Sequence, residues 1–278
     1  MGQKWPDCDP KIKEFVNGAV QVFKDSIPEK LDAVLLHGSL SMGSFYPPKS
    51  DIDLLILANS PLDLDEQKQI HGRLIDLTDN RPITGFLELS VVLSDQARQP
   101  KHPIPYELHF GEEFPDKIRN GEFDYDKAKG NDPDLAAHFT VRKNRGIPLF
   151  GPPPKQVLGD LPWQDYLDSV LDDLGWILDE KNILTSPFYG VLNCCRVLEM
   201  LDKGEGTVSS KEEGALWALD TLPAEHHDII RFALECYKSD KPVSSEQRQK
   251  AGEEWPEDKL LKFRDYVRIV KCEKVKQL

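Results

Sequence analysis

Long apolar runs are missing from this sequence. No hydrophobic stretch in its 278 residues approaches the roughly 20 residues that span a bilayer. The opening segment, MGQKWPDCDPKIKEF, is charged and contains no apolar signal core, and Pro6 stands where a myristoylation signal requires Ser or Thr. We therefore expect a cytoplasmic protein without a membrane partner.

The sequence also contains few cysteines and fewer positive than negative charges. Five cysteines are an odd number and show no CxxC spacing, which favours free thiols in a reducing compartment and predicts neither disulfides nor a zinc site. Lys and Arg number 35 against 48 Asp and Glu, so the formal net charge is −13. Because affinity for a phosphate backbone is built from Lys and Arg, this balance disfavours nucleic acid and favours small or cationic partners.

What is present indicates a globular chain that changes character midway. Helical spacing of apolar residues predicts helices over 10–25 and 63–77, and β-rich runs predict strands over 32–39, 50–58 and 86–94. Residues 100–135 are rich in Pro, Gly and carboxylates, which is typical of a long, partly irregular surface segment. Residues 134–151 then read as a helix followed by a short strand.

A proline-dense stretch, GPPPKQVLGDLP, marks the expected boundary between two domains. After it the chain contains five amphipathic segments with short polar joints, which predict a helical bundle. We therefore predict an α+β domain over 1–155, a mixed sheet with helices, and an all-α domain over 156–278.

Two aspartates on one strand are the strongest chemical signal. Residues two apart on a strand point to the same face, so Asp51 and Asp53 place two like charges side by side. One or two Mg²⁺ ions would relieve that repulsion, with substrate phosphates completing the shell. Gly38 would let the backbone approach a phosphate closely, and Ser39 would offer donors to it. The plain alternative is a solvated strand end that follows an ordinary turn.

The spacing of these residues resembles the signature of the polymerase-β-like nucleotidyltransferases. LHGS is followed by eleven residues and then DIDL, and Glu88 in LELSVV stands where that superfamily keeps a third carboxylate. A P-loop is excluded because Ser44 and Phe45 replace its Lys and Ser/Thr.

The order and spacing of further segments narrow the resemblance. ELHFGEE, IPLFGPPP and SKEEGALWALDTLP follow one another as in the aminoglycoside adenylyltransferases, which modify streptomycin at its 3'' hydroxyl and spectinomycin at its 9 hydroxyl. The likeness covers nearly the whole chain. It implies a two-domain enzyme that moves AMP from Mg-ATP to a hydroxyl of a small cationic acceptor, with a role in antibiotic resistance and, we expect, as a monomer.

The resemblance also implies roles for individual residues. Asp51, Asp53 and Glu88 would be the metal-binding and catalytic carboxylates, with Glu88 as base, metal ligand or both. The residues implied in nucleotide binding are Gly38, Ser39, Ser50, Arg196, Lys211 and Tyr237. From the residues alone, Arg196 reads as a surface or ion-pair side chain, and Lys211 as part of a helix N-terminal turn.

The acceptor side departs from the family pattern. Glu113 replaces a Trp, and Ser186 stands where relatives carry an acidic residue. Glu112 and Glu113 are the candidate contacts for a cationic sugar, although they also fit a solvated acidic loop. The loop over 179–190 contains no Trp, so the larger streptomycin would lose a stacking contact and spectinomycin is the favoured acceptor.

Two other functions remain open at this point. An adenylyltransferase could act on a protein or another non-drug acceptor, although the strong negative charge argues against RNA. A regulator that binds nucleotides without catalysis could also keep the fold. Retention of all three carboxylates argues against that second alternative.

Overall fold

The computed structural model describes residues 2–276. Contacts between Cα atoms divide the chain into a unit from Gln3 to Tyr166 and a second unit that begins at Leu167. No helix within the described residues is both long enough and apolar enough to cross a membrane.

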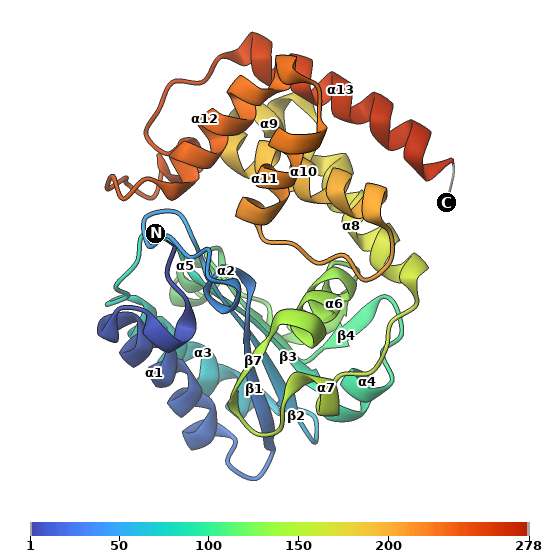
Figure 1. The fold of residues 1–278 in the computed structure, drawn as a ribbon. Coiled ribbons are helices and arrows are strands. Elements are labelled where there is room, and N and C mark those ends of the chain that lie inside the picture. The colour runs from blue at the N-terminus through green and yellow to red at the C-terminus, as the bar shows by residue number, and fades with distance from the viewer. Residues whose placement is uncertain (1, 277–278) are drawn as a thin grey trace. The chain divides into compact units, whose positions relative to one another are not determined.

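A five-stranded mixed sheet forms the centre of the Gln3–Tyr166 unit (Figure 1). Its order is β5-β3-β2-β1-β7; β2 and β3 run parallel, and the other neighbours are antiparallel. The five strands are β1 (Leu31–His37), β2 (Ile52–Ala58), β3 (Leu87–Leu93), β5 (Leu108–Phe110) and β7 (Ile147–Phe150). The mixed sheet and the three strands predicted from β-rich runs are confirmed.

Helices cover both faces of this sheet. The bounds are α1 (Pro10–Ser26), α2 (Gly38–Met42), α3 (Leu64–Thr78), α4 (Ser94–Arg98), α5 (Phe114–Arg119), α6 (Leu135–Arg145) and α7 (Pro154–Val157). The predicted helices over 10–25 and 63–77 are confirmed as α1 and α3. Both begin at a side-chain cap: Asp9 accepts from the amide of Lys11, and Asp63 forms a capping box with Glu66.

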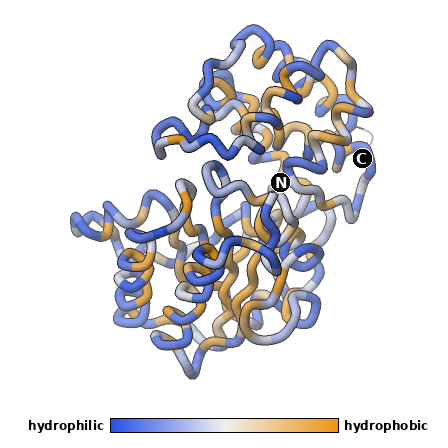
Figure 2. Tube along the Cα trace, turned by 60° about the vertical axis from the view of Figure 1, so that its left-hand side comes forward, coloured by the Kyte–Doolittle hydropathy of each residue, from blue (hydrophilic) through white to orange (hydrophobic). Residues whose placement is uncertain are grey.

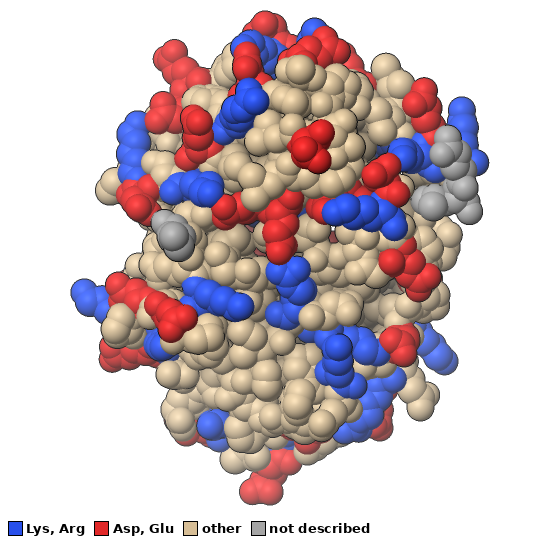
Figure 3. Space-filling view, viewed as in Figure 1, with Lys and Arg blue, Asp and Glu red and all other residues tan. Residues whose placement is uncertain are grey.

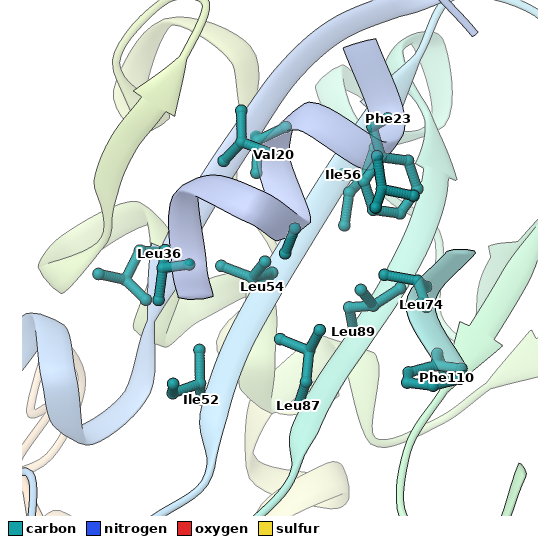
Figure 4. Close-up of a cluster of buried hydrophobic side chains, with 14 of the residues drawn as sticks. Val20, Phe23, Leu36, Ile52, Leu54, Ile56, Leu74, Leu87, Leu89 and Phe110 are labelled. Atoms are coloured by element: carbon teal, nitrogen blue, oxygen red, sulfur yellow. The ribbon is translucent and has the colours of Figure 1, made fainter. Parts of the chain in front are cut away.

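The two-residue period of the strands divides the core between the two faces. Ile52, Leu54 and Ile56 of β2 are buried in a cluster with residues of α1 and α3, part of which Figure 4 shows. Leu55 and Leu57 belong to a second cluster that includes residues of α6 and α7. Hydrophobic residues accordingly follow the strands, and hydrophilic residues the outer sides of the helices (Figure 2).

The segment 100–135 contains more regular structure than expected. A two-stranded sheet pairs β4 (Ile104–Tyr106) with β6 (Gly130–Asp132), and β5 adds an edge to the main sheet. The expectation of an irregular surface segment is wrong for Leu108 and Phe110, which are buried in the core. Three-residue strands are too short for an alternating pattern to be recognised in the sequence.

Every element described between Leu167 and Lys276 is helical. These are α9 (Glu180–Thr185), α10 (Pro187–Lys203), α11 (Lys211–Thr221), α12 (His227–Lys238) and α13 (Glu257–Val275), together with most of α8 (Trp163–Ile177). Single 3₁₀ turns occur at Ala224–His226 and Arg248–Lys250 here, and at Trp5–Asp7 and Tyr125–Lys127 in the first unit. The five predicted helical segments are present, and α9 is an additional short helix. Ser210 and Glu213 form the capping box that starts α11.

Leu54→Ala tests whether the α1 and α3 face of the sheet supports the first unit. Leu54 has 0% exposure, so its truncation removes buried methyl groups and leaves a cavity, at a cost of about 2–5 kcal/mol in the free energy of unfolding. Leu64→Ala is the matched control, because Leu64 is 45% exposed and its loss should change stability by about 0.5 kcal/mol or less. The measurement is urea unfolding followed by circular dichroism. Equal midpoints for the two variants would contradict this account of the core.

Candidate functional site

Three neighbouring strands bring three polar residues into one row. In the sheet register His37 of β1 lies opposite Asp53 of β2, and Asp53 lies opposite Glu88 of β3. Their apolar neighbours Leu36, Leu54 and Leu87 belong to the cluster on the α1 and α3 side. The row therefore lies on the opposite face of the sheet, where Leu35 and Leu55 pack with α6.

This face borders a cavity of about 310 Å³ that is lined mainly by charged and polar residues. Five carboxylates line it: Asp53, Glu88, Glu113, Asp132 and Asp134. The other polar residues of its wall are His37, Ser90, His109, His138 and Arg142. All of them belong to the unit from Gln3 to Tyr166.

Two glycines let the backbone approach the aspartates closely. A Cβ atom at Gly38 would lie 1.9 Å from Oδ2 of Asp53, and Gly38 has φ of +65°. A Cβ atom at Gly85 would lie 2.8 Å from Oδ1 of Asp51 and 2.2 Å from the carbonyl oxygen of Ser50. Both positions therefore require glycine if the two carboxylates are to keep their places.

The donor set fits a divalent cation held by two carboxylates. Asp51 and Asp53 carry the carboxylate oxygens that Mg²⁺ prefers; Asp53 lines the cavity, whereas Asp51 is not part of its wall. The Asp53 carboxylate itself fills the place that a Cβ atom at Gly38 would take. The Asp51 carboxylate accepts a hydrogen bond of 2.7 Å from the amide of Phe86, which fixes its orientation. Within residues 2–276 no three His, Cys, Asp or Glu side chains are already gathered as a metal site.

The serines of the motif occupy different settings. Ser50 is buried, and its hydroxyl accepts a hydrogen bond of 3.0 Å from the amide of Tyr46, so it stabilises the turn before β2. Ser39 is half-buried in α2, the five-residue helix that follows β1. Neither serine belongs to the wall of the cavity.

The other carboxylates that the sequence predicts for the site also occupy different settings. Glu88 is exposed on its strand and lines the cavity, which suits a side chain that meets a substrate. Glu113 lines the same cavity, whereas Glu112 is exposed and is not part of its wall. The acidic segment therefore contributes one of its two predicted contacts to this cavity.

The three predicted nucleotide residues of the second unit lie on α10, α11 and α12. Nζ of Lys211 lies 5.0 Å from the centre of the Tyr189 ring and 5.6 Å from that of the Tyr237 ring. Arg196 lies against α11, because a Cβ atom at Gly214 would come within 2.9 Å of its backbone nitrogen. Lys211 is the first residue of α11, so the reading of SKEEG as a helix N-terminus is correct as well.

A hydrogen-bonded row of Ser90, His109 and Asp132 was not predicted from the sequence. Nδ1 of His109 lies 2.9 Å from the Ser90 hydroxyl, and its Nε2 lies 3.3 Å from Oδ2 of Asp132. Burial acts to raise the pKa of Asp132, but the hydrogen bonds from His109 and from the amide of Asp134, together with the charge of His109, outweigh burial and lower that pKa. In the neutral imidazole Nε2–H therefore donates to Asp132, and Nδ1 accepts from Ser90. Ser90 and Glu88 are two residues apart on β3 and share a face.

A second row of polar residues comes from α6. Nη2 of Arg142 donates to Nδ1 of His138 at 3.2 Å, and Nε2 of His138 lies 3.1 Å from Oδ2 of Asp134. Burial lowers the pKa of Arg142 to about 9, so its guanidinium remains charged at neutral pH. Burial, the Arg142 charge and His138 lower the pKa of His37, which keeps that imidazole neutral. In the sequence Arg142 belongs to the basic run RKNR, which gives no signal of burial.

Gly38→Ala tests the close approach of α2 to Asp53. The added methyl group overlaps the Asp53 carboxylate, and the positive φ adds strain of about 1–2 kcal/mol. We expect a lower melting temperature and loss of Mg-dependent nucleotide binding. Gly72→Ala is the control, because its Cβ atom would meet nothing within 4 Å and replacing a helical glycine stabilises by about 0.5–1 kcal/mol. Normal nucleotide affinity in Gly38→Ala would show that Asp53 can move without consequence.

Comparison with known proteins finds one group of similar enzymes. Residues 156–259 match the family model "Aminoglycoside adenylyltransferase, C-terminal domain". The chain is 26% identical over 238 residues to a Staphylococcus aureus spectinomycin 9-adenylyltransferase, covering 83% of this chain and 86% of the relative. It is 27% identical over 237 residues to an aminoglycoside (3'') (9) adenylyltransferase of Klebsiella pneumoniae, covering 82% of this chain and 86% of that protein.

The fold has a solved counterpart. The spectinomycin adenyltransferase AAD(9) from Enterococcus faecialis, whose crystal structure holds ATP and spectinomycin, superimposes with a TM-score of 0.76 at 18% identity, covering 93% of this chain and 98% of that one. The family model matches the helical part of the chain, and the curated relatives match most of its length. The chain is therefore similar, over more than four fifths of its length, to spectinomycin and aminoglycoside adenylyltransferases.

Proposed function

We propose that this chain transfers AMP from Mg-ATP to a hydroxyl of an aminocyclitol or aminoglycoside and releases pyrophosphate. The observation that carries the proposal is the register of the central strands. It sets Asp53 and Glu88 opposite one another, in a cavity lined by five carboxylates. A nucleotide-binding carboxylate thereby lies beside a side chain able to take a proton from the acceptor.

The nucleotide half of the site consists of Asp51, Asp53 and the loop from Gly38. Asp51 and Asp53 would hold Mg²⁺, which when bound neutralises charge on the triphosphate and polarises the phosphorus under attack. Gly38 admits the phosphate chain close to the backbone, and Ser39 donates to it. Ser50 supports this half by holding the turn that leads through Asp51 into the start of β2.

Glu88 is proposed as the base of the transfer. It accepts the proton of the acceptor hydroxyl while the hydroxyl oxygen forms its bond to the α-phosphorus. The bond from that phosphorus to the bridging oxygen breaks, and the electron pair leaves with pyrophosphate. The exposure of Glu88 supports this role, because a base must meet its substrate.

The acceptor half is proposed to recognise positive charge. Glu113 and Asp132 line the cavity beside Glu88, and opposite charges attract strongly where solvent is partly excluded. The outer surface of the protein carries charges of both signs. On the face that Figure 3 shows, Lys and Arg gather where α4, α6 and α7 lie, and Asp and Glu are widely spread. The carboxylate lining is therefore a local property of the cavity, which supports a cationic amino sugar or aminocyclitol as its occupant.

The second unit is proposed to contribute to nucleotide binding through Arg196, Lys211 and Tyr237. The contacts of Lys211 with Tyr237 and of Arg196 with α11 hold these residues on adjoining helices. Two cations near the triphosphate would stabilise the charge that develops on the leaving pyrophosphate. On this proposal residues 1–155 form the nucleotidyltransferase domain and residues 156–278 the helical domain.

Glu88→Gln tests the assignment of the base. Glutamine keeps the size of the side chain but cannot accept the proton, so the rate should fall by roughly 10² or more. The affinity for Mg-ATP, measured by titration calorimetry, should stay close to that of the unchanged protein. Glu112→Gln is the control, since Glu112 is not part of the cavity wall and its change should leave the rate unaltered. A parallel collapse of ATP affinity in Glu88→Gln would make Glu88 chiefly a metal ligand.

The choice of acceptor is tested with spectinomycin and streptomycin. Loss of one stacking or charged contact costs about 1–3 kcal/mol, so we expect spectinomycin to be modified roughly 5-fold to over 100-fold better. The measurement is the mass increase of one AMP on each drug in the presence of purified protein and Mg-ATP. Better modification of streptomycin would point to Trp176, which is 51% exposed and 6.4 Å from the Tyr189 ring, as the missing contact. Modification of neither drug, with ATP bound normally, would place the acceptor outside this class.

A further inference from the structure

Arg142 is a buried cation in the wall of the cavity that also contains Asp53 and Glu88. Only 2% of Arg142 is exposed, although arginine is among the residues most rarely buried. Its position on α6 places it on the functional face of the sheet, because α6 packs over the side of β2 that carries Asp53. A charge buried at this place needs partners, or it lowers the stability of the fold.

One end of the guanidinium is fixed. Arginine can only donate, so Nη2 of Arg142 donates to Nδ1 of His138, and the other nitrogen of that ring donates to Asp134. The ring of Phe139 lies with its centre 5.9 Å from the guanidinium carbon. These contacts hold the guanidinium in one orientation before any ligand arrives.

The other end of the guanidinium has no partner among the described residues. Nε and Nη1 of Arg142 are both buried and make no hydrogen bond, and Nε2 of His37 is likewise unpaired. Asp53, Asp134 and Asp132 stabilise the charge from a distance but leave these donors unused. Buried polar groups are usually hydrogen-bonded, so two unpaired donors on one buried guanidinium call for an explanation. Arg142 lines the cavity, and two unused N–H groups on a residue of its wall suit a ligand with anionic oxygens.

The chemistry of the cavity identifies which anion this is. The adjacent N–H groups of a guanidinium match two oxygens of a phosphoryl group. Arg142 shares the cavity with Glu88, and the base must lie beside the acceptor hydroxyl and therefore beside the phosphorus that the hydroxyl attacks. The α-phosphoryl group is thus the part of the nucleotide that meets Arg142, in preference to the β or γ group.

We propose that Arg142, oriented by His138 and Asp134, is a further catalytic residue that binds the non-bridging oxygens of the α-phosphoryl group through Nε–H and Nη1–H. This inference rests on the proposed function, since it assigns a residue to the same transfer. Arg142 stabilises the charge on these oxygens while the new oxygen–phosphorus bond forms and the bond to pyrophosphate breaks.

The test compares Arg142→Met and Arg142→Lys with Arg98→Met, an exposed arginine of the same unit. We expect Arg142→Met to weaken binding of α,β-methylene-ATP in the presence of Mg²⁺ by roughly 10-fold or more, measured by calorimetry without an acceptor. The preference between the Rp and Sp isomers of the α-thio analogue of ATP should also shrink, because one non-bridging oxygen has lost its partner. Arg142→Lys should recover part of the affinity but not the preference, since lysine lacks the planar fork. Arg98→Met should change neither quantity.

The melting temperature separates this role from a structural one. Replacing a buried cation that has unused donors by an apolar side chain of similar volume should leave the melting temperature of Arg142→Met unchanged or raise it. A lower melting temperature together with unchanged nucleotide affinity and isomer preference would overturn the inference. A wild-type protein that binds the analogue and modifies no acceptor would overturn the proposed function alone. A wild-type protein that binds no adenine nucleotide would overturn both.

Discussion

The alternation of side chains along β2 is the constraint on which the site depends. Ile52, Leu54 and Ile56 fill the core beneath α1 and α3, and this fixes which face of the sheet Asp53 occupies. A shift of the pairing by one residue would turn the carboxylate into that core and the leucines into the cavity. The same burial that stabilises the sheet thus excludes every register except the one that aligns His37, Asp53 and Glu88.

Much of this arrangement is readable in the sequence because the signals are local. Gly38, Asp51 and Asp53 lie within sixteen residues of one another, and the strands that carry them are long enough to show their pattern. Glu88 can be predicted in the same way, because it lies on the next long strand in the chain. Gly38 was expected to permit close approach to a phosphate, and the structure adds a second demand on it, since its backbone also lies against Asp53.

The rest of the site could not be predicted because tertiary packing assembles it. His109 lies on a three-residue strand, LHF, within a segment that reads as irregular. Asp132 lies on another three-residue strand, GND, which has no large apolar residue. Arg142 lies in a basic run whose composition suggests a solvated helix end. Their proximity to Glu88 depends on β5 joining the sheet and α6 crossing it, and neither event has a signature in spacing or composition. The short helix α9 was not predicted either, because its six residues are too few to show a helical pattern in the sequence.

The strand order has a consequence for how this protein can change over evolutionary time. Asp53 belongs to β2, the middle strand of five, whose amides should exchange with solvent only when the whole unit opens. His109 belongs to β5 at the sheet edge, and Asp132 to a separate two-stranded ribbon, where local opening is far less costly. Substitutions around His109 and Asp132 are therefore tolerated more readily than substitutions around Asp53. A chain built in this way can change the part of the cavity wall that β5 and β6 contribute while the strands that carry Asp53 and Glu88 stay as they are.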